Sequence, residues 1–449
     1  TMPILAPDAV LTPNGFVRDD VVVVEAGRVT SVGRLPEGGA GEVVRLPGRV
    51  LVPGLVNAHS HAFQRALRGT LTDGSAVDFW RWRDRMYALV RSLDPDGIEA
   101  ISALAFAEMA EAGITHVGEF HYVHHQPDGT PYDDPDALAH RVVAAARTAG
   151  LRITLLRVAY ERNGDQPLHD AQRRFVDAGP EPVLASVDRL TARYAGMDDV
   201  MVGLAPHSVR AVPRASLEAF ADFEGPLHVH VSEQPAENAF CQAESGRSPT
   251  ALLDDCGLLS ERFTAVHLTW PEAGDLYRLE RAGAGVCACP STELDLADGF
   301  LPVDVRRGLP ICLGSDSHAR IDLFAEARTL EMHGRAQTGR RGILGQPERG
   351  GGDGRLAWRA LTAATAEGRR ALGISGASLG IRPGDPADLV AIDVTGLAAW
   401  GVPPLEAVVG QAHPGWVDAV WVGGRQVVAG GRHLRREAIV DALAEAQSG

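Results

Sequence analysis

The sequence contains no lysine, and all 43 of its basic residues are arginine. Codon bias is the simplest explanation of this absence. It still has a chemical consequence, because a pair of metal ions bridged by a carboxylated lysine cannot form in this chain. Any metal site must be built from other ligands.

Cysteine is scarce as well, and five residues of this type are spread over the second half of the chain: Cys241, Cys256, Cys287, Cys289 and Cys312. An odd number without regular spacing does not fit the disulfide framework of a small secreted protein. Cys287-Ala-Cys289 has the spacing of a ligand pair, but free cysteine is among the most buried residue types. We therefore expect buried thiols on a strand.

Long hydrophobic runs are missing too, since no apolar stretch reaches the roughly 18 residues of a membrane span. We find no signal peptide, and Thr1 before Met2 has the character of an expression remnant. These features predict a cytoplasmic protein. Acidic residues outnumber basic ones, 58 to 43, for a formal net charge of −15. This balance argues against non-specific binding to nucleic acid or to an anionic membrane.

The middle of the chain alternates short apolar segments with helical patterns, most clearly at Ile98–Ala112 and Ala137–Ala149. Parallel strands joined by crossover helices predict a (β/α)₈ TIM barrel over residues 51–379. The eighth strand is followed by a Gly- and Arg-rich stretch, residues 335–354, which predicts a mobile loop. The strand candidates are Leu51–Asn57, Thr115–Gly118, Ile153–Val158, Val200–Ala205, Leu227–Val231, Phe263–Val266, Gly285–Cys289 and Pro310–Gly314.

Both ends of the chain carry strand patterns instead. Val21–Val24 and Arg28–Val32 flank a short turn that contains glycine, which indicates a hairpin. Asp388–Asp393 and Val417–Val422 are apolar runs near the other end. We expect residues 1–50 and 380–433 to form one small β-sandwich, because neither segment has enough strands alone. Residues 434–449 have the spacing of a C-terminal helix.

Side chains of the metal-ligand type follow several strand candidates at their carboxyl ends, where barrels place their chemistry. His59 and His61 lie two residues apart on an extended segment, so they point to the same side and can hold one cation. His230 ends the fifth strand and Asp316 the eighth, whereas His228 lies deeper and is expected to be structural. Three imidazoles and one carboxylate suit one divalent metal, best Zn²⁺, with Fe²⁺ or Mn²⁺ as alternatives.

The residues around this site predict deamination. A metal ion would bring the pKa of a bound water toward about 7, and Asp316 could accept its proton as well as hold the metal. His267, at the end of the sixth strand, could hydrogen-bond the attacking hydroxide. Glu233 lies three residues after His230 and could deliver protons to a nitrogen leaving group, which favours deamination over ester hydrolysis. A solvated loop glutamate is the alternative interpretation of Glu233.

These motifs resemble the amidohydrolase superfamily, on its deaminase side, over nearly the whole chain. A narrower resemblance is to the N-formimino-L-glutamate deiminases, carried by Asn57–Arg65, Asp78–Tyr87, Glu119–His125 and Ala205–Arg210. That family belongs to histidine degradation, and its members convert a formimino group to formyl and release ammonia. The resemblance also implies a homodimer.

The resemblance further implies a set of residues that hold a small anionic amidine substrate: Gln64, Arg83, Tyr122, His207 and Arg210. Arg85 is the alternative to Arg83. The residue types fit, because the substrate carries two carboxylates and the planar fork of arginine can bind both oxygens of each. A surface salt bridge is the alternative for each arginine. His121, His124 and His125 share one loop, so we expect structural or ligand-supporting roles for them.

Three other functions fit parts of the pattern. An aminohydrolase of the same superfamily would act on a neutral heterocycle, such as cytosine, guanine or a triazine, with little dependence on Arg83 and Arg210. A non-catalytic barrel would usually have lost metal ligands, which this chain keeps. A dinuclear amidase is disfavoured by the missing lysine, and formimino-aspartate is an alternative substrate.

Overall fold

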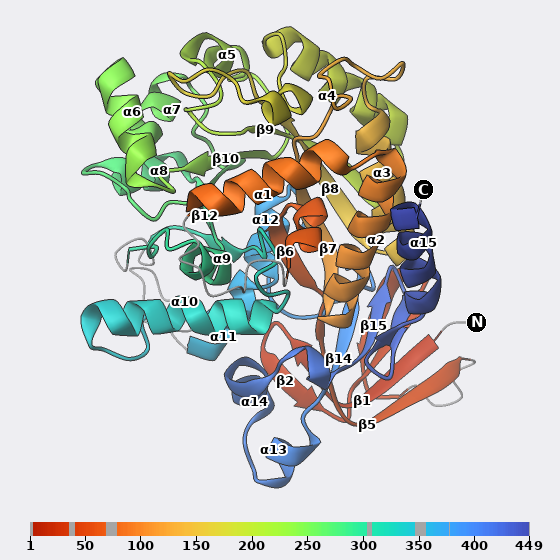
Figure 1. The fold of residues 1–449 in the computed structure, drawn as a ribbon. Coiled ribbons are helices and arrows are strands. Elements are labelled where there is room, and N and C mark those ends of the chain that lie inside the picture. Colours follow the sequence, from red (N-terminus) through yellow and green to blue (C-terminus); the bar gives the residue numbers. More distant parts are fainter. Residues whose placement is uncertain are drawn as a thin grey trace.

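Eight parallel strands form the centre of the molecule in the computed structural model, which describes residues 3–35, 41–68, 79–302, 308–345, 356–376 and 378–448 (Figure 1). They neighbour one another in chain order from the first to the last, so the predicted TIM barrel is confirmed. The strands are β6 (Leu55–Ser60), β7 (Ile114–His121), β8 (Arg152–Ala159), β9 (Val200–Pro206), β10 (Leu227–Val231), β11 (Phe263–His267), β12 (Gly285–Ala288) and β13 (Ile311–Leu313).

The barrel closes between β6 and the segment that follows β13. Ser60 forms an isolated parallel bridge with Asp316. The Asp316 N–H donates to the His59 carbonyl over 3.0 Å, and the His61 N–H donates to the Asp316 carbonyl over 3.1 Å. We call this junction, residues 57–61 against 315–316, the seam. It holds together the two ends of the barrel where three candidate ligands lie.

Helices surround the barrel, and their ends follow the sequence signals. The predicted helices correspond to α2 (Pro95–Glu111) and α3 (Ala137–Ala149). The Asp94 carboxylate caps α2 by accepting the Gly97 N–H, and Gly150 ends α3 at a φ of 74°. The remaining α-helices of the described chain are α1 (Phe79–Ser92), α4 (Pro180–Tyr194), α5 (Arg214–Ala219), α6 (Pro235–Ser245), α7 (Pro249–Asp255), α8 (Asp275–Ala282), α9 (Pro290–Asp295), α10 (Leu323–Thr338), α11 (Leu356–Ala363), α12 (Ala366–Ala371), α13 (Thr395–Ala399), α14 (Pro404–Gln411) and α15 (Arg436–Ser448).

The two ends of the chain form a second, mostly antiparallel sheet, as predicted. The sheet is continuous and folds over its own core. A Cβ on Gly424, which lies in a turn between two strands, would come within 2.8 Å of a Val24 methyl although neither of those strands neighbours that of Val24 in the sheet. Buried side chains of both chain ends, such as Leu5 and Trp421, share that core. Its strands are β1 (Pro3–Thr12), β2 (Gly15–Arg18), β3 (Val21–Glu25), β4 (Arg28–Gly33), β5 (Glu42–Pro53), β14 (Leu389–Asp393), β15 (Val417–Val422), β16 (Arg425–Ala429) and β17 (Arg432–His433).

The expected first barrel strand, Leu51–Asn57, is two strands in the structure. Residues 51–53 end β5 and pair with β14, whereas Leu55 begins β6 in the barrel. Gly54 lies between them, where a Cβ would come within 2.1 Å of the Thr115 hydroxyl. Only glycine fits this close passage, so the chain changes sheets there.

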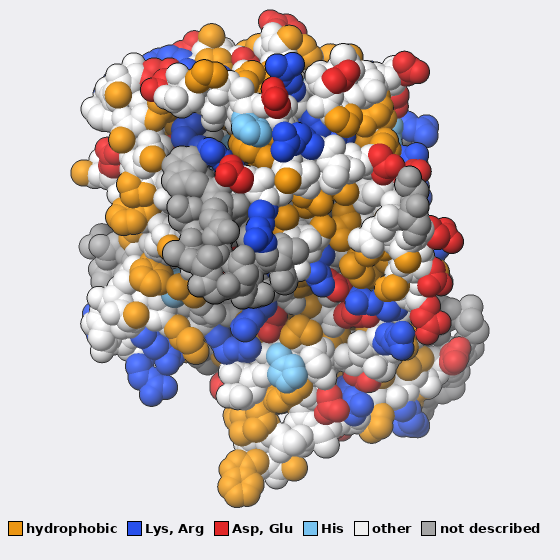
Figure 2. Space-filling model, viewed as in Figure 1, with side chains coloured by type: hydrophobic (Ala, Val, Ile, Leu, Met, Phe, Trp, Pro, Cys, Tyr) orange, Lys and Arg blue, Asp and Glu red, His pale blue; other side chains and the backbone are white. Residues whose placement is uncertain are grey.

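The terminal helix α15 packs on α2, and the two chain ends lie on the same side of the molecule (Figure 1). Acidic and basic side chains are interspersed over the face in Figure 2, and hydrophobic atoms gather at its lower tip, over α13. Trp400, which directly follows α13, is 86% exposed. In the described part of the chain, no helix has both the length and the apolar character needed to cross a membrane.

Candidate active site

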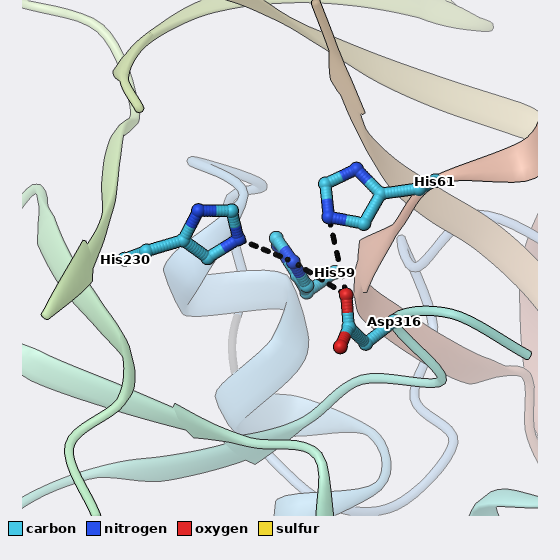
Figure 3. Close-up of side chains that lie close together, drawn as sticks. All are labelled: His59, His61, His230 and Asp316. Carbon is cyan, nitrogen blue, oxygen red and sulfur yellow. Dashed lines mark hydrogen bonds and ion pairs between the residues drawn. The ribbon is translucent and has the colours of Figure 1, made fainter. Parts of the chain in front are cut away.

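Four side chains of the metal-ligand type converge at the carboxyl ends of the barrel strands (Figure 3). His59 lies near the end of β6, His61 directly follows it, His230 lies near the end of β10, and Asp316 follows β13. All four are buried, and one ligand atom of each lies within 4.8 Å of the others. The structure therefore brings together the four residues that the sequence predicted as metal ligands.

The distances within this cluster fit a single ion. Asp316 Oδ1 lies 3.2 Å from His59 Nε2 and 3.1 Å from His61 Nε2, and the Nε2 atoms of His59 and His230 are 3.1 Å apart. Atoms bonded to one tetrahedral ion at about 2.1 Å lie about 3.4 Å from one another. Only a small adjustment would be needed to seat the ion.

The hydrogen bonding of His61 also fits a cation. Its Nδ1 lies 3.1 Å from the carbonyl of Phe120, which can only accept, so Nδ1 carries the proton. In the neutral ring Nε2 then has a lone pair, and it faces the carboxylate of Asp316, a second acceptor. Two acceptors at this distance attract each other only through a cation between them. The imidazoles are suited to this role, because burial lowers the pKa of His59 to about 3 and that of His230 well below its usual value.

Backbone strain accompanies the site. Asp316 has a φ of 44° and His267 a φ of 73°, and both conformations are unfavourable for residues other than glycine. Gly314 precedes Asp316 where a Cβ would lie 2.7 Å from the Cβ of His59. The chain thus passes closely beneath His59 before turning sharply to aim the Asp316 carboxylate at the imidazoles.

His267 lies beside the cluster between two carboxylates. Its ring stacks on that of His230, with centroids 5.4 Å apart. Glu233 Oε1 is 3.7 Å from its Nε2, and Glu293 Oε1 is 3.4 Å from its Nδ1. Burial alone would lower the pKa of His267, but the charges of Glu233, Glu293 and Asp316 raise it to about 10. This arrangement combines a hydrogen-bond donor, an acid–base carboxylate and the four candidate metal ligands in one place.

A cavity of about 280 Å³ opens onto this group. Glu233, His267 and Asp316 line it together with all the residues expected to hold the substrate, which are Gln64, Arg83, Tyr122, His207 and Arg210. Arg85 is not among the lining residues. The Gln64 side-chain N–H donates to the Tyr122 hydroxyl over 2.9 Å, and its buried Oε1 has no partner in the described chain.

Arg210 is one of three arginines that line the cavity, with Arg83 and Arg162. Burial disfavours its charge, but the carboxylates of Glu237 and Glu233 more than offset this effect and raise its pKa. Its buried Nε has no hydrogen-bond partner among the described residues. The side chain is thus a charged donor facing a cavity, which is what an anionic ligand requires.

The other candidate ligands lie outside the cluster. His228 Nε2 contacts the Ala371 carbonyl at 2.8 Å, and His124 and His125 each contact a backbone carbonyl at 3.0 Å. All five cysteines are buried and free, which confirms the expectation of buried thiols. Cys287 packs with Cys289 and Cys312 in a small apolar cluster.

Two buried glutamates support the site and were missed from the sequence. Glu119 accepts the Ser60 hydroxyl over 2.6 Å and the Ala62 N–H over 2.7 Å, so it clamps both neighbours of His61. Glu293, in the first turn of α9, supports His267. Glu119 lies within the buried strand β7, and a charged residue in such an apolar setting is the signal that could have found it, whereas the polar sequence around Glu293 gives no comparable signal.

The comparisons agree with this site. The family model of the amidohydrolase family matches residues 50–427. The chain is 38% identical to formimidoylglutamate deiminase of Pseudomonas aeruginosa over 440 residues, covering 95% of each chain. It is 30% identical to 8-oxoguanine deaminase of the same organism, covering 95% of this chain and 93% of that one. A crystal structure of an amidohydrolase from Brucella melitensis superposes with a TM-score of 0.89 at 32% identity and covers 99% of both chains. The predicted resemblance is confirmed: the chain belongs to the amidohydrolase family and is a deaminase-type enzyme that hydrolyses C–N bonds.

Proposed function

We propose that this protein hydrolyses N-formimino-L-glutamate to N-formyl-L-glutamate and ammonia, a reaction of histidine degradation. One observation carries the proposal: Arg83 and Arg210 line the same cavity as the candidate metal ligands, together with a third arginine, Arg162, which pairs with Glu244. The proposed substrate has a carboxylate at each of two positions and an amidine-like group at its other end. The similarity to formimidoylglutamate deiminase over 95% of both chains supports the same assignment.

The charge of the cavity favours a dianion over a neutral heterocycle. In a chain with a net charge of −15, an anionic ligand needs local positive groups, and the guanidinium fork is suited to carboxylates. Arg83 lies above the ring of Tyr87, 5.5 Å from its centroid, and this contact helps to fix the guanidinium at the cavity wall. A neutral base would offer no negative charge to the Arg210 guanidinium, whose buried Nε has no hydrogen-bond partner among the described residues.

We further propose that His59, His61, His230 and Asp316 hold one divalent metal, with Zn²⁺ as the best match to three imidazoles and a carboxylate. Such a metal lowers the pKa of a bound water and so supplies a nucleophile at neutral pH. Burial lowers the pKa of His59 to about 3 and that of His230 well below its usual value, so both are in the neutral form that binds metals.

In the proposed reaction, Asp316 accepts the proton of the attacking water, and His267 hydrogen-bonds the oxygen that attacks the formimino carbon. Glu233 then delivers a proton to the terminal nitrogen, and the proton held by Asp316 follows it. The nitrogen leaves as ammonia while Glu233 takes up the proton of the new hydroxyl, which restores both carboxyl groups. Gln64, Tyr122 and His207 orient the substrate. Arg83 and Arg210 hold its carboxylates, so they contribute to binding more than to the chemical step.

Ammonia release from N-formimino-L-glutamate by zinc-loaded protein tests this function. Parallel assays use N-formimino-L-aspartate, guanine, 8-oxoguanine and cytosine. We expect turnover of the glutamate derivative and little turnover of the heterocycles. Efficient deamination of a heterocycle without turnover of either formimino acid would refute the proposal and favour the heterocyclic rival, to which the 30% identity with 8-oxoguanine deaminase points.

Arginine variants sharpen this test. Arg210→Met and Arg83→Met are expected to raise KM by about 10- to 100-fold with a smaller change in kcat, because a hydrogen bond to a charged group is worth about 1.5–3 kcal/mol. Arg85→Met changes the same helix, α1, at a position outside the cavity lining, so its KM should stay near the wild-type value. A larger effect of Arg85→Met than of Arg83→Met would reverse the assignment of the two residues.

A further inference from the structure

One wall of the active-site cavity comes from three separate elements. Helix α1 contributes Arg83 and Tyr87, the segment after β7 contributes Tyr122, and the segment after β8 contributes Tyr160. None of these side chains can hold an anionic substrate in one place unless the three elements keep a fixed relation. The structure must therefore contain something that joins them.

The joining element is a short 3-10 helix, η2 (Asp170–Arg174), together with Phe175. The N–H groups of His124 and His125, after β7, donate to the Arg174 carbonyl over 2.8 and 3.0 Å. The Gln172 side chain donates to the Tyr160 hydroxyl over 2.7 Å. The ring of Phe175 packs against Tyr122, Tyr160 and Tyr87, with centroids 4.9, 5.6 and 6.4 Å away.

The side chain of Arg174 completes this junction by reaching α1. It has no exposed surface, and it donates to the carbonyls of Val90 and Leu93 at the carboxyl end of that helix. It also donates to the His125 carbonyl over 2.8 Å and lies 3.4 Å from the Tyr132 hydroxyl. It forms no salt bridge in the described chain. A cation is favourable at the carboxyl end of a helix, and the guanidinium has enough donors for several carbonyls at once.

We propose that Arg174 is a positioning residue for the substrate carboxylate. It fixes α1 against η2 and the segment after β7, and it thereby sets the place of the Arg83 guanidinium and of the Tyr87 ring beneath it. Arg174 itself does not line the cavity and would not touch the substrate. The inference rests on the proposed function, in which Arg83 binds a carboxylate of the substrate.

The inference predicts a separation between binding and chemistry. The candidate metal ligands and Glu233 lie on or directly after β6, β10 and β13. Among the described residues, the hydrogen bonds of the Arg174 side chain go to Val90, Leu93, His125 and Tyr132, and they reach none of these segments. Loss of the guanidinium should therefore displace Arg83 and Tyr87 and leave the reacting groups in place. A purely structural arginine would instead lower stability without any selective effect on substrate binding.

Arg328 offers a matched control. Its guanidinium donates to the carbonyls of Val409 and Ala412, over 3.1 and 2.8 Å, at the carboxyl end of α14. It thus clamps a helix end as Arg174 does, but α14 carries no residue of the cavity lining. Arg174→Met, Arg174→Lys and Arg328→Met form the set of variants.

The experiment measures kcat and KM for N-formimino-L-glutamate, the metal content, and the Kd of N-formyl-L-glutamate by calorimetry. We expect Arg174→Met to raise KM and Kd by about 10- to 100-fold, the size of effect that a small misplacement of binding groups produces, with metal content unchanged and kcat within about threefold. Arg174→Lys should be intermediate, because an ammonium donates to carbonyls without the planar fork. Arg328→Met should leave KM and Kd unchanged.

An unchanged KM in Arg174→Met, an equal rise in Arg328→Met, or a fall in kcat alone would overturn the inference. If Arg174→Met does not fold, Arg174→Lys and Gln172→Leu decide the matter, since the latter removes the bond to the Tyr160 hydroxyl while Arg174 stays. Wild-type KM in both would overturn it. Failure of the proposed function is a separate result, because the wild-type protein would then not turn over N-formimino-L-glutamate at all.

Discussion

Glu233 and Glu293 approach His267 from opposite nitrogens of its ring, at 3.7 and 3.4 Å. The two carboxylates have different surroundings. Glu233 lines the cavity, so it can reach a substrate, whereas Glu293 has no exposed surface and also accepts the Cys289 N–H over 2.8 Å. The two glutamates thus have separable functions: Glu233 carries protons, and Glu293 supports the His267 ring.

Glu233→Gln should lower kcat by about 10²- to 10⁴-fold, because positioned acid–base groups contribute this much to catalysis. The amide keeps the size of the side chain and cannot deliver a proton, so KM and metal content should change little. Steady-state kinetics and metal analysis check this outcome. Asp316→Asn provides the contrast, since it should lose both activity and metal; a Glu233→Gln variant with nearly full kcat would contradict the assigned function.

Glu293→Gln should lower kcat by about tenfold with little change in KM, a typical effect of removing a partner that orients an active-site group. The amide oxygen can still accept the Cys289 N–H, but the negative charge beside His267 is lost. Glu326→Gln is the matched control. Glu326, on α10, is equally buried and accepts the N–H of Ser291 over 2.8 Å; Ser291 lies in α9, the helix that carries Glu293. Burial raises the pKa of Glu326 to about 8. It is therefore mostly protonated at pH 7, and its amide variant should keep the wild-type kcat; equal losses in both variants would contradict the prediction.

At the scale of elements, the helix and strand patterns were predictable, whereas the division of one apolar run between two sheets was not. Helix α3 and strand β10 coincide with the predicted ranges, because helical spacing and short apolar runs are local signals. The run 50–56 gave no sign that it divides between two sheets, since both strands are equally apolar and the division depends on the tertiary contact of Gly54 with Thr115. The predicted loop after the eighth strand was wrong at its start. Helix α10 continues to Thr338, where Arg335 pairs with Glu331 over 2.9 Å, and residues 346–354 lie outside the described chain.

At the scale of elements, the seam depends on the buried side chain of Asn57. The Asn57 side chain donates to the Ser315 hydroxyl over 2.7 Å and accepts the Ser315 N–H over 2.9 Å, with no exposed surface. Asn57→Ala leaves the Ser315 N–H buried without a partner, while the Ser315 hydroxyl keeps its contact with His318, and it should lower the free energy of unfolding by about 1–3 kcal/mol. It should also weaken metal binding by about 10- to 100-fold, because Asp316 directly follows Ser315.

Metal titration with a competing chelator and denaturant unfolding measure the two effects in Asn57→Ala. Ser248→Ala is the control, since it removes a buried hydrogen bond to Asp275, of 2.5 Å, at the start of α7 and outside the seam. We expect it to lose stability and keep the metal affinity of the wild type. Full metal affinity in Asn57→Ala would show that the side chain of residue 57 does not hold Asp316 in place.

At the scale of the whole molecule, the four candidate ligands connect parts of the barrel that the sequence separates widely. His59 and His61 belong to the first strand and its end, His230 to the fifth strand, and Asp316 to the segment after the last strand. Their convergence was predictable, because the carboxyl ends of parallel strands in a barrel share one rim. The supporting contacts of Glu119 and Arg174 were not, since the first depends on the register of β6 against β7 and the second on which loops meet above that rim. A protein of this fold can thus be assigned its metal chemistry from strand ends, while the support of its substrate wall requires the structure.

Removal of the metal should weaken this connection between the first and last strands of the barrel. An ion bound to His59, His61 and Asp316 links both sides of the seam, so it should stabilise the closed barrel by about 2.7 kcal/mol when the free metal is 100 times its Kd. Chelation should lower the Tm, and zinc should restore it. Amide hydrogen exchange should rise most in residues 57–61 and 315–316, because their cross-strand bonds depend on closure. The β14 and β15 amides serve as the internal reference, since they pair in the separate sheet. A uniform rise over both sheets, or no rise at the seam, would mean that the ion does not hold the barrel closed.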